Sequence, residues 1–450
     1  MATALTVAGI ILFFLGLLFS IAWHELGHLS TAKMFGIRCT QYMVGFGPTL
    51  WSRTRGDTEY GVKAVPLGGY VRMVGMIPPA SERDEGKPMG RWRRMIEEAR
   101  EASFVELEEG DEERQFYQRA PWKRLIVMFA GPAMNLILAV VLFIVVLMGI
   151  GIQQPGTAVE SVAECVVAAD AADQSCSEDA PPTPAAEAGF KPGDRIVEIA
   201  GEPAPNWAAA NELIRDSIGP TEFTVERGGE RIGLTADLIE NDVVARDAEG
   251  EIIVKTGPDG EPLTDEQGYQ IPETQKAGFL GITFQNERTP LAAGETASYM
   301  GDTIVGVGQA IISLPSKVDD VFRAAFLGEE RGVDSPVGIV GASRIGGEVL
   351  SQPIPLLDRA AFMLNMLAGV NLFLFAFNML PILPLDGGHM LGALWEWVRR
   401  GIARVFKRPD PGPFDVAKLM PVAYVVVACF LVFSAMLLIA DVVNPVRIMQ

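Results

Sequence analysis

Four long stretches of the chain contain no charged side chain. They run from Met1 to Trp23, from Leu125 to Val159 with an apolar core that ends near Ile152, from Ala360 to Leu385 and from Leu419 to Ala440. A membrane-spanning helix needs about 20 consecutive, mainly apolar residues. The pattern therefore predicts four transmembrane helices. Because the first stretch has neither a positively charged start nor a small-residue cleavage site, we do not expect it to be a removed signal peptide.

Between these stretches the pattern changes to short alternating runs that are typical of β-strands. After the first span, two such runs, 50–53 and 59–64, lie on either side of the turn residues Arg55-Gly56-Asp57 and predict a β-hairpin. Glycines and prolines at 45–48 and 66–69 flank the two expected strands. After the second span, the alternation predicts a small α+β domain. Its expected elements are strands at 195–200, 222–227, 231–238 and 278–284 and a helix at 207–218, with an acidic insertion at 241–276. A weaker apolar segment, 296–315, predicts an amphipathic surface helix.

The charges beside the spans predict the orientation of the chain. Lys33 and Arg38 follow the first span, Lys123 and Arg124 precede the second, and a basic linker follows the third, whereas 152–290 is strongly acidic. Basic residues next to a span favour the cytoplasmic side. We therefore expect the N-terminus and the region 152–355 to be extracytoplasmic, and the loops after spans one and three to be cytoplasmic.

Composition narrows the possible functions. The chain has 450 residues, 49% of them hydrophobic, and a net charge of −19. Nucleic-acid binding needs clustered positive charge, so no nucleic-acid partner is expected. Three histidines and four cysteines are too few for a zinc-finger array or a disulfide scaffold. Cys165 and Cys176 both fall on the predicted outer side, where they could pair or remain free.

The end of the first span reads His24-Glu25-Leu26-Gly27-His28. Residues four apart lie on one face of a helix, so His24 and His28 could hold one zinc ion. Glu25 would lie beside that ion as the general base for an attacking water. The alternative is a polar cap on a membrane helix, but three adjacent polar or ionisable positions in lipid would be costly without a function.

Catalytic zinc needs a third protein ligand. Asp386, in Leu385-Asp386-Gly387-Gly388, is the favoured candidate because the predicted topology brings the ends of spans one and three to the same side of the membrane. His389, three residues later, is the rival ligand, and spacing alone does not separate the two.

The residues before Asp386 suggest substrate binding. Asn371 and Asn378 lie seven residues apart on nearly the same helix face, and Pro381 and Pro384 interrupt regular helix. Asparagine amides could bind a substrate backbone or stabilise an oxyanion, and an unwound segment leaves backbone groups free. For the asparagines, the alternative is interhelical hydrogen bonding, which is common in membranes.

In order, these motifs resemble those of site-2-type intramembrane zinc metalloproteases from the bacterial branch that carries out regulated intramembrane proteolysis. The resemblance rests on His24–His28 at the end of span one, Gly131–Asn135 in span two, Asn378–Pro381 and Leu385–Gly388. It covers the whole chain and includes the small extracytoplasmic domain, which resembles a single PDZ domain. It implies that His24, His28 and Asp386 bind Zn²⁺ and that Glu25 is the general base.

The resemblance also implies an organisation. The chain would be a multipass α-helical membrane protein with four main transmembrane helices, a membrane-associated β-hairpin and an extracytoplasmic α+β PDZ domain. The expected segments are helix 1 with its HELGH motif (1–30), a cytoplasmic loop with the hairpin (31–124), helix 2 (125–152), the PDZ-like domain with its acidic insertion (153–290), surface helices (291–358), helix 3 with the LDGG motif (359–400), a cytoplasmic linker (401–418) and helix 4 (419–441).

The same resemblance implies location and partners. The protein would lie in the bacterial inner membrane, with its active site open towards the cytoplasm. Its substrates would be single-pass membrane proteins such as anti-sigma factors, already shortened outside by a site-1-type protease. Two other classes remain open. An inactive scaffold would bind almost no zinc, and a metal transporter would need ionisable groups in several spans, although spans two and four contain none.

Overall fold

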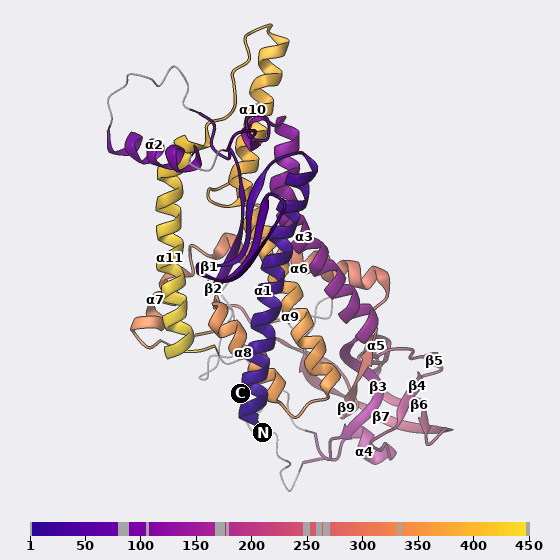
Figure 1. The fold of residues 1–450 in the computed structure, drawn as a ribbon. Coiled ribbons are helices and arrows are strands. Elements are labelled where there is room, and N and C mark those ends of the chain that lie inside the picture. Colours follow the sequence, from indigo (N-terminus) through magenta and orange to yellow (C-terminus); the bar gives the residue numbers. More distant parts are fainter. Residues whose placement is uncertain are drawn as a thin grey trace. The chain divides into compact units, whose positions relative to one another are not determined.

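The computed structural model describes residues 2–79, 90–104, 108–166, 176, 180–245, 253–257, 263, 271–329, 331–332 and 335–446. The chain divides into two compact units (Figure 1). The first combines Met1–Gly151 with Pro290–Gln450, and the second is Ile152–Thr289. Much of the predicted acidic insertion, 241–276, lies outside the described residues.

Within the described residues, four helical segments are long and apolar enough to cross a membrane. They are α1 (Ala2–Met34), α3 (Pro121–Phe143) with its continuation η3 (Ile144–Ile150), α9 (Leu356–Asn378) and α11 (Met420–Val443), which follows the short η4 (Val416–Leu419). The expected third helical segment, 359–400, is divided in two. Helix α9 ends at Asn378, and a separate helix, α10 (Asp386–Val405), begins after the proline-containing turn.

Small residues bring α1 close to its neighbours. A side chain on Gly9 would meet the backbone of Gly346 and Gly347 in α8 (Ile339–Ser351), with the nearest atom 2.8 Å away. Farther along α1, Asn371 of α9 donates a hydrogen bond of 2.8 Å to the Ser20 hydroxyl. Close backbone approach and interhelical hydrogen bonds are the means by which membrane helices associate. They fix the position of the helix that carries both histidines.

The hairpin is much longer than the sequence indicates. Its strands are β1 (Cys39–Arg55) and β2 (Thr58–Met73), where only 50–53 and 59–64 were expected. The glycines and prolines that seemed to bound the strands instead lie within them, at register shifts. Met43 of β1 pairs with two residues of β2, Tyr70 and Gly61, because the strands bend and their segments lie side by side in a wider sheet. The sheet packs on α1, where Tyr42 donates a hydrogen bond to the Ala22 carbonyl (Figure 1).

The remaining described elements of the first unit are four helices and a short turn of 3-10 helix. They are α2 (Arg91–Phe104), η2 (Phe116–Gln118), α6 (Ala293–Ser313), α7 (Val318–Phe326) and α8. Helix α6 lies where the sequence predicts an amphipathic segment, at 296–315, and many of its apolar side chains, such as Ile312, are exposed.

The second unit is a sheet with two helices. The strand order is β8-β7-β6-β4-β3-β9, with the short β5 beside β4. The elements are β3 (Ile152–Val162), α4 (Pro184–Ala188), β4 (Arg195–Ile199), β5 (Glu202–Pro203), α5 (Trp207–Asp216), β6 (Gly219–Arg227), β7 (Glu230–Val244), β8 (Thr274–Phe279) and β9 (Ile282–Thr289). The prediction of a single closing strand at 278–284 is wrong. The chain turns at Leu280-Gly281, where Gly281 has a φ of 86°, so two strands form.

The core of this unit is apolar and closely packed, with Phe190 and Phe223 in edge-to-face contact. Cys165 and Cys176 form a disulfide, with Cα atoms 5.8 Å apart. This settles a pairing that the sequence leaves open.

A buried carboxylate predicts how this unit responds to acid. Arg227 donates hydrogen bonds to both carboxylate oxygens of Asp194, and the Lys191 backbone N–H donates a third. Burial alone would raise the pKa of Asp194, but these donors hold that pKa below its usual value. The native state thus binds fewer protons than the unfolded state, and the stabilisation is lost as pH falls through the native pKa. In the full chain, we expect Asp194→Asn to increase hydrogen exchange in β4 at neutral pH, with the difference from wild type narrowing as pH falls below about 3.9, the pKa of an unperturbed Asp carboxyl. A constant difference would contradict this.

Candidate metal centre

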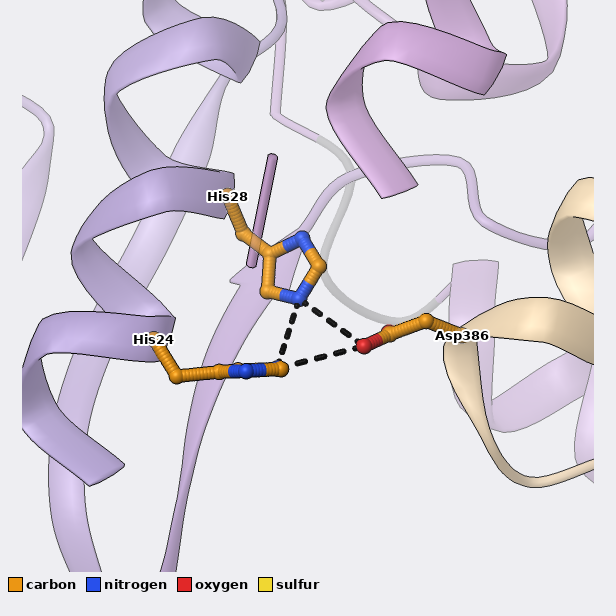
Figure 2. A group of neighbouring side chains, drawn as sticks. All are labelled: His24, His28 and Asp386. Atoms are coloured by element: carbon orange, nitrogen blue, oxygen red, sulfur yellow. Dashed lines mark hydrogen bonds and ion pairs between the residues drawn. The ribbon is translucent and has the colours of Figure 1, made fainter. Parts of the chain in front are cut away.

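Three side chains from distant parts of the chain converge in the first unit. The Nε2 atoms of His24 and His28 lie 3.2 Å apart, and Asp386 Oδ2 lies 3.2 Å from the first and 3.3 Å from the second. Figure 2 shows both imidazoles projecting from one helix towards the carboxylate at the start of another. His24 and Asp386 are 362 residues apart in sequence. Among the described residues, this is the group whose ligand atoms could hold a metal ion.

The two histidines are positioned by helix geometry and by glycine. They lie on one face of α1 and are both buried. Gly131 of α3 lies directly against His28, since a side chain at this position would lie 2.1 Å from His28 Nε2. Gly27 is equally close to the Ala130 carbonyl, at 2.3 Å for an added Cβ. The space that holds the His28 ring therefore exists because Gly131 lacks a side chain.

The donor set and its spacing fit zinc. Tetrahedral zinc binds nitrogen and oxygen at about 2.0–2.2 Å, which puts neighbouring ligand atoms about 3.3–3.5 Å apart. The three atoms here form a triangle with edges of 3.2, 3.2 and 3.3 Å. Three protein ligands leave the fourth position available, as in catalytic rather than structural zinc sites.

The hydrogen bond made by the other ring nitrogen of His28 leaves its Nε2 free to bind a metal. His28 Nδ1 lies 2.8 Å from the Val127 carbonyl oxygen. A carbonyl only accepts, so Nδ1 carries the hydrogen and Nε2 keeps its lone pair for a metal.

Asn135 of α3 plays the same part for His24, and sequence reasoning assigned it no role. Its amide lies 3.2 Å from His24 Nδ1 and the residue is buried. If His24 Nε2 binds a metal, Nδ1 carries the hydrogen and needs an acceptor. The Asn135 amide oxygen is the acceptor at hand, and it has no other partner. The nitrogen and oxygen of an amide are alike in shape, so the group can be turned over without a change in packing. In the metal-bound site the Asn135 oxygen would face His24 Nδ1. The signal in the sequence was a polar residue in span two, four residues after Gly131.

Removing that acceptor should weaken metal binding without removing a ligand. We expect Asn135→Ala to lower zinc affinity by about 10–100-fold, as is typical for partners of metal-binding histidines. Competition with a chelating indicator measures this. Asn135→Asp, which keeps an acceptor oxygen, should bind zinc more tightly than Asn135→Ala. Equal affinities for wild type and Asn135→Ala would show that the amide does not orient His24.

Glu25 lies between the histidines in sequence and faces the hairpin. It is not one of the three converging groups. A side chain on Gly69 of β2 would lie 2.9 Å from Glu25 Cγ, and the Val71 backbone hydrogen-bonds the Glu25 carboxylate. Glu25, the predicted general base, therefore lies against the backbone of β2 and next to the metal triangle, as we name the three ligand atoms of His24, His28 and Asp386.

Asp386 is held by a tight turn. The segment between α9 and α10 contains a cis peptide bond at Leu383-Pro384, and Asp386 begins α10. Gly387 and Gly388 let the turn close, since a side chain on Gly387 would lie 2.2 Å from the Leu380 carbonyl oxygen. Burial raises the pKa of Asp386, whereas protonated His28 and His24 rings facing the carboxylate would lower that pKa below its usual range.

The other predicted residues lie near this turn with different surroundings. His389 is outside the triangle, and burial lowers the pKa of its imidazole. Asn371 is fully buried and bonds Ser20, which is the interhelical arrangement named as its alternative. Asn378 donates to the Leu374 carbonyl within its own helix. Pro381 lines an apolar cavity of about 240 Å³, and Pro384 is exposed. A substrate-binding role for these residues stays a prediction.

The chain is similar to known metalloproteases over most of its length. The model of peptidase family M50 matches residues 12–408. The chain is 34% identical to zinc metalloprotease Rip1 of Mycobacterium tuberculosis over 99% of each chain, and 33% identical to Rip1 of Mycolicibacterium smegmatis over 98% of this chain and 99% of that one. Metalloprotease MmpA of Caulobacter vibrioides is 27% identical over 88% of this chain and 86% of its own.

Proposed function

Because this chain belongs to peptidase family M50, a family of zinc-dependent metalloproteases, we propose that it hydrolyses peptide bonds within or next to transmembrane segments of other membrane proteins. The observation that carries the proposal is the triangle of His24, His28 and Asp386. Two of its members lie in a helix long and apolar enough to span a bilayer, and the third begins the helix that follows another such span. A protease built this way meets its substrate in or beside the lipid.

Zinc, bound by His24, His28 and Asp386, would polarise the scissile carbonyl and make water more acidic. Glu25 would take the proton of the attacking water and then deliver it to the leaving amine. Asn135 and the Val127 carbonyl would keep both histidines in the required tautomer and orientation.

A transmembrane substrate must unwind before it can be cut, because a helix uses its carbonyls in its own hydrogen bonds. The hairpin supports this step, since β2 runs past Glu25 at Gly69–Val71 and an extended substrate strand could pair with such a sheet. The segment from Asn378 to Pro384 lies at the break between α9 and α10, just before Asp386, and would contact the same strand.

Reconstitution tests this function. The purified chain would be placed in liposomes with a peptide that crosses the membrane once, and products identified by mass spectrometry. We expect a cut in or beside the apolar segment, loss of cutting after chelation, and recovery with one equivalent of zinc. A preparation that holds one zinc per chain but cuts none of a panel of single-pass peptides would contradict the proposal.

We also propose that residues 153–290 form a PDZ domain that excludes intact substrates. The sheet ends at β9, and α5 and β9 border a groove of about 350 Å³ lined in part by Trp207, Ile214 and Phe284. Such a groove beside a strand edge suits an extended peptide. Replacing 153–288 by a short linker should let a full-length substrate be cut. Continued resistance of that substrate would contradict a filtering role.

The orientation inferred from charge completes the proposal. The N-terminus and residues 152–355 would lie outside the bacterial inner membrane, and the metal centre would open towards the cytoplasm. Substrates would then be proteins such as anti-sigma factors that a site-1-type protease has already cut outside. An alkaline phosphatase reporter fused near residue 230 should be active, and an inactive fusion would reverse the topology.

A further inference from the structure

We propose that Arg124 and Glu396 are positioning residues of the metal centre, which hold the helix that orients both histidines at a fixed distance from the helix that carries Asp386. The inference rests on the proposed function, because it concerns the same site. Neither residue is one of the three candidate ligands. In the sequence, Arg124 served only as a basic residue beside a span, and Glu396 was assigned no role.

The first step is the role of α3. Val127 bonds His28, Gly131 packs on the His28 ring and Asn135 bonds His24, so one helix sets the orientation of both imidazoles. Arg124 lies on the same helix, three residues before Val127, which places it about one turn away on the same face. A shift of α3 at Arg124 would therefore move the partners of both rings.

The second step is the connection to α10. Arg124 and Glu396 form an ion pair in which both side chains are buried, with exposures of 4% and 0%. Glu396 lies in α10, ten residues after Asp386, or about 15 Å along the axis. Helix α10 packs along α3 (Figure 1). The pair thus joins the helix that orients two candidate ligands to the helix that begins with the third.

The third step is that Glu396 binds more than one element. Its carboxylate also pairs with Arg400 at 3.1 Å and accepts a hydrogen bond of 2.7 Å from the Phe414 backbone. Phe414 packs over Gly392 of α10 and joins Leu383, Val416 and Ala423 in a cluster. Leu383 belongs to the turn that delivers Asp386. Glu396 therefore fixes α10 against α3 on one side and against the connection to α11 on the other.

We expect this ion pair to fix the geometry of the metal centre rather than to increase the stability of the fold. A buried ion pair contributes little net stability compared with apolar side chains of similar volume. The contact nevertheless restricts the relative placement of the two helices, because moving them apart would leave the buried Arg124 charge without its counter-charge. A zinc site with three protein ligands is sensitive to such placement, because small displacements lengthen a ligand bond.

Metal binding by the full chain in detergent tests the inference. The probes are Zn²⁺, titrated against a chelating indicator, and Co²⁺, whose visible spectrum reports coordination geometry. We expect Glu396→Gln to lower zinc affinity by about 10–100-fold, in the range seen for supporting residues of metal sites, and to change the Co²⁺ spectrum. Wild-type affinity together with a wild-type spectrum would overturn the proposal.

The double variant R124M/E396L separates position from stability. Apolar replacement should restore the melting temperature towards that of wild type. If the pair positions the ligands, zinc affinity stays low in this variant. If the pair is merely structural, affinity recovers with the melting temperature, and the proposal fails. The double variant also covers the case in which Glu396→Gln does not fold.

A matched control is an ion pair between other helices of the first unit. Arg331 and Asp441 form an equally buried pair, which joins α11 to the start of α8. Asp441→Asn should lower the melting temperature but leave zinc affinity and the Co²⁺ spectrum unchanged, and equal losses in both variants would count against a specific role for Glu396. If wild type itself binds neither metal, the proposed function fails. If wild type binds and Glu396→Gln matches it, only this inference fails.

Discussion

Replacing Glu25 with glutamine is expected to lower the rate of peptide cleavage by about 10²–10⁴-fold, the usual contribution of a general base. Zinc content should remain that of wild type, because Glu25 contributes no atom to the triangle formed by His24, His28 and Asp386. Glutamine has nearly the same shape and can still accept a hydrogen bond from the Val71 backbone, but it cannot take up a proton at neutral pH. Single-turnover cleavage in liposomes, with metal analysis of the same sample, measures both quantities.

The matched control is Glu348→Gln on α8, which removes a carboxylate that pairs with Arg344 on the same helix. This substitution should change neither rate nor zinc content. If Glu25→Gln cuts as fast as wild type, the proton must be carried by another group, and the assignment of Glu25 fails although the metal site stands. If Glu25→Gln instead loses zinc, its effect on the rate says nothing about proton transfer.

The sequence predicted the long apolar helices and the convergence of His24, His28 and Asp386 well, because the helices and the histidine pair depend on local and strongly constrained patterns. A run of about 20 apolar residues has few uses other than spanning a bilayer. Two histidines four apart must share a helix face, wherever that helix packs. The third member, Asp386, is 362 residues from His24, and its identification needed topology and family resemblance as well as spacing.

What the sequence did not reveal depends on contacts between segments. The role of Asn135 as a partner of His24 could be identified only from the packing of α3 against α1, since a single asparagine in a membrane helix has several ordinary explanations. The length of the hairpin was underestimated because glycines and prolines within a strand look like its ends, although bulges accommodate them. The pair of Arg124 and Glu396 could not be predicted either. The prolines indicate that the helix is interrupted before Asp386, but the packing of α10 on α3 is not encoded locally.

The largest effect is expected from removing a candidate ligand. Asp386→Ala should leave the purified chain with little zinc and no measurable cleavage, a greater loss than that caused by Glu25→Gln. The reason is geometric. Without the Asp386 carboxylate, only two imidazoles of one helix remain, and their Nε2 atoms 3.2 Å apart offer a metal two ligands of no net charge. Metal analysis, before and after incubation with excess zinc, measures the loss.

His389→Ala provides the decisive comparison, since His389 is the rival third ligand and lies three residues further along α10. Its imidazole is outside the triangle, so this variant should retain one zinc per chain. His24→Ala should behave like Asp386→Ala, because His24 Nε2 lies 3.2 Å from Asp386 Oδ2 and the two would bind the same ion. The reverse pattern, with zinc retained in Asp386→Ala and lost in His389→Ala, would transfer the ligand role to His389. It would also require α10 to shift by about 4.5 Å along its axis, because three residues separate the two side chains. The buried packing of Gly387 and Gly388 against the turn opposes such a shift.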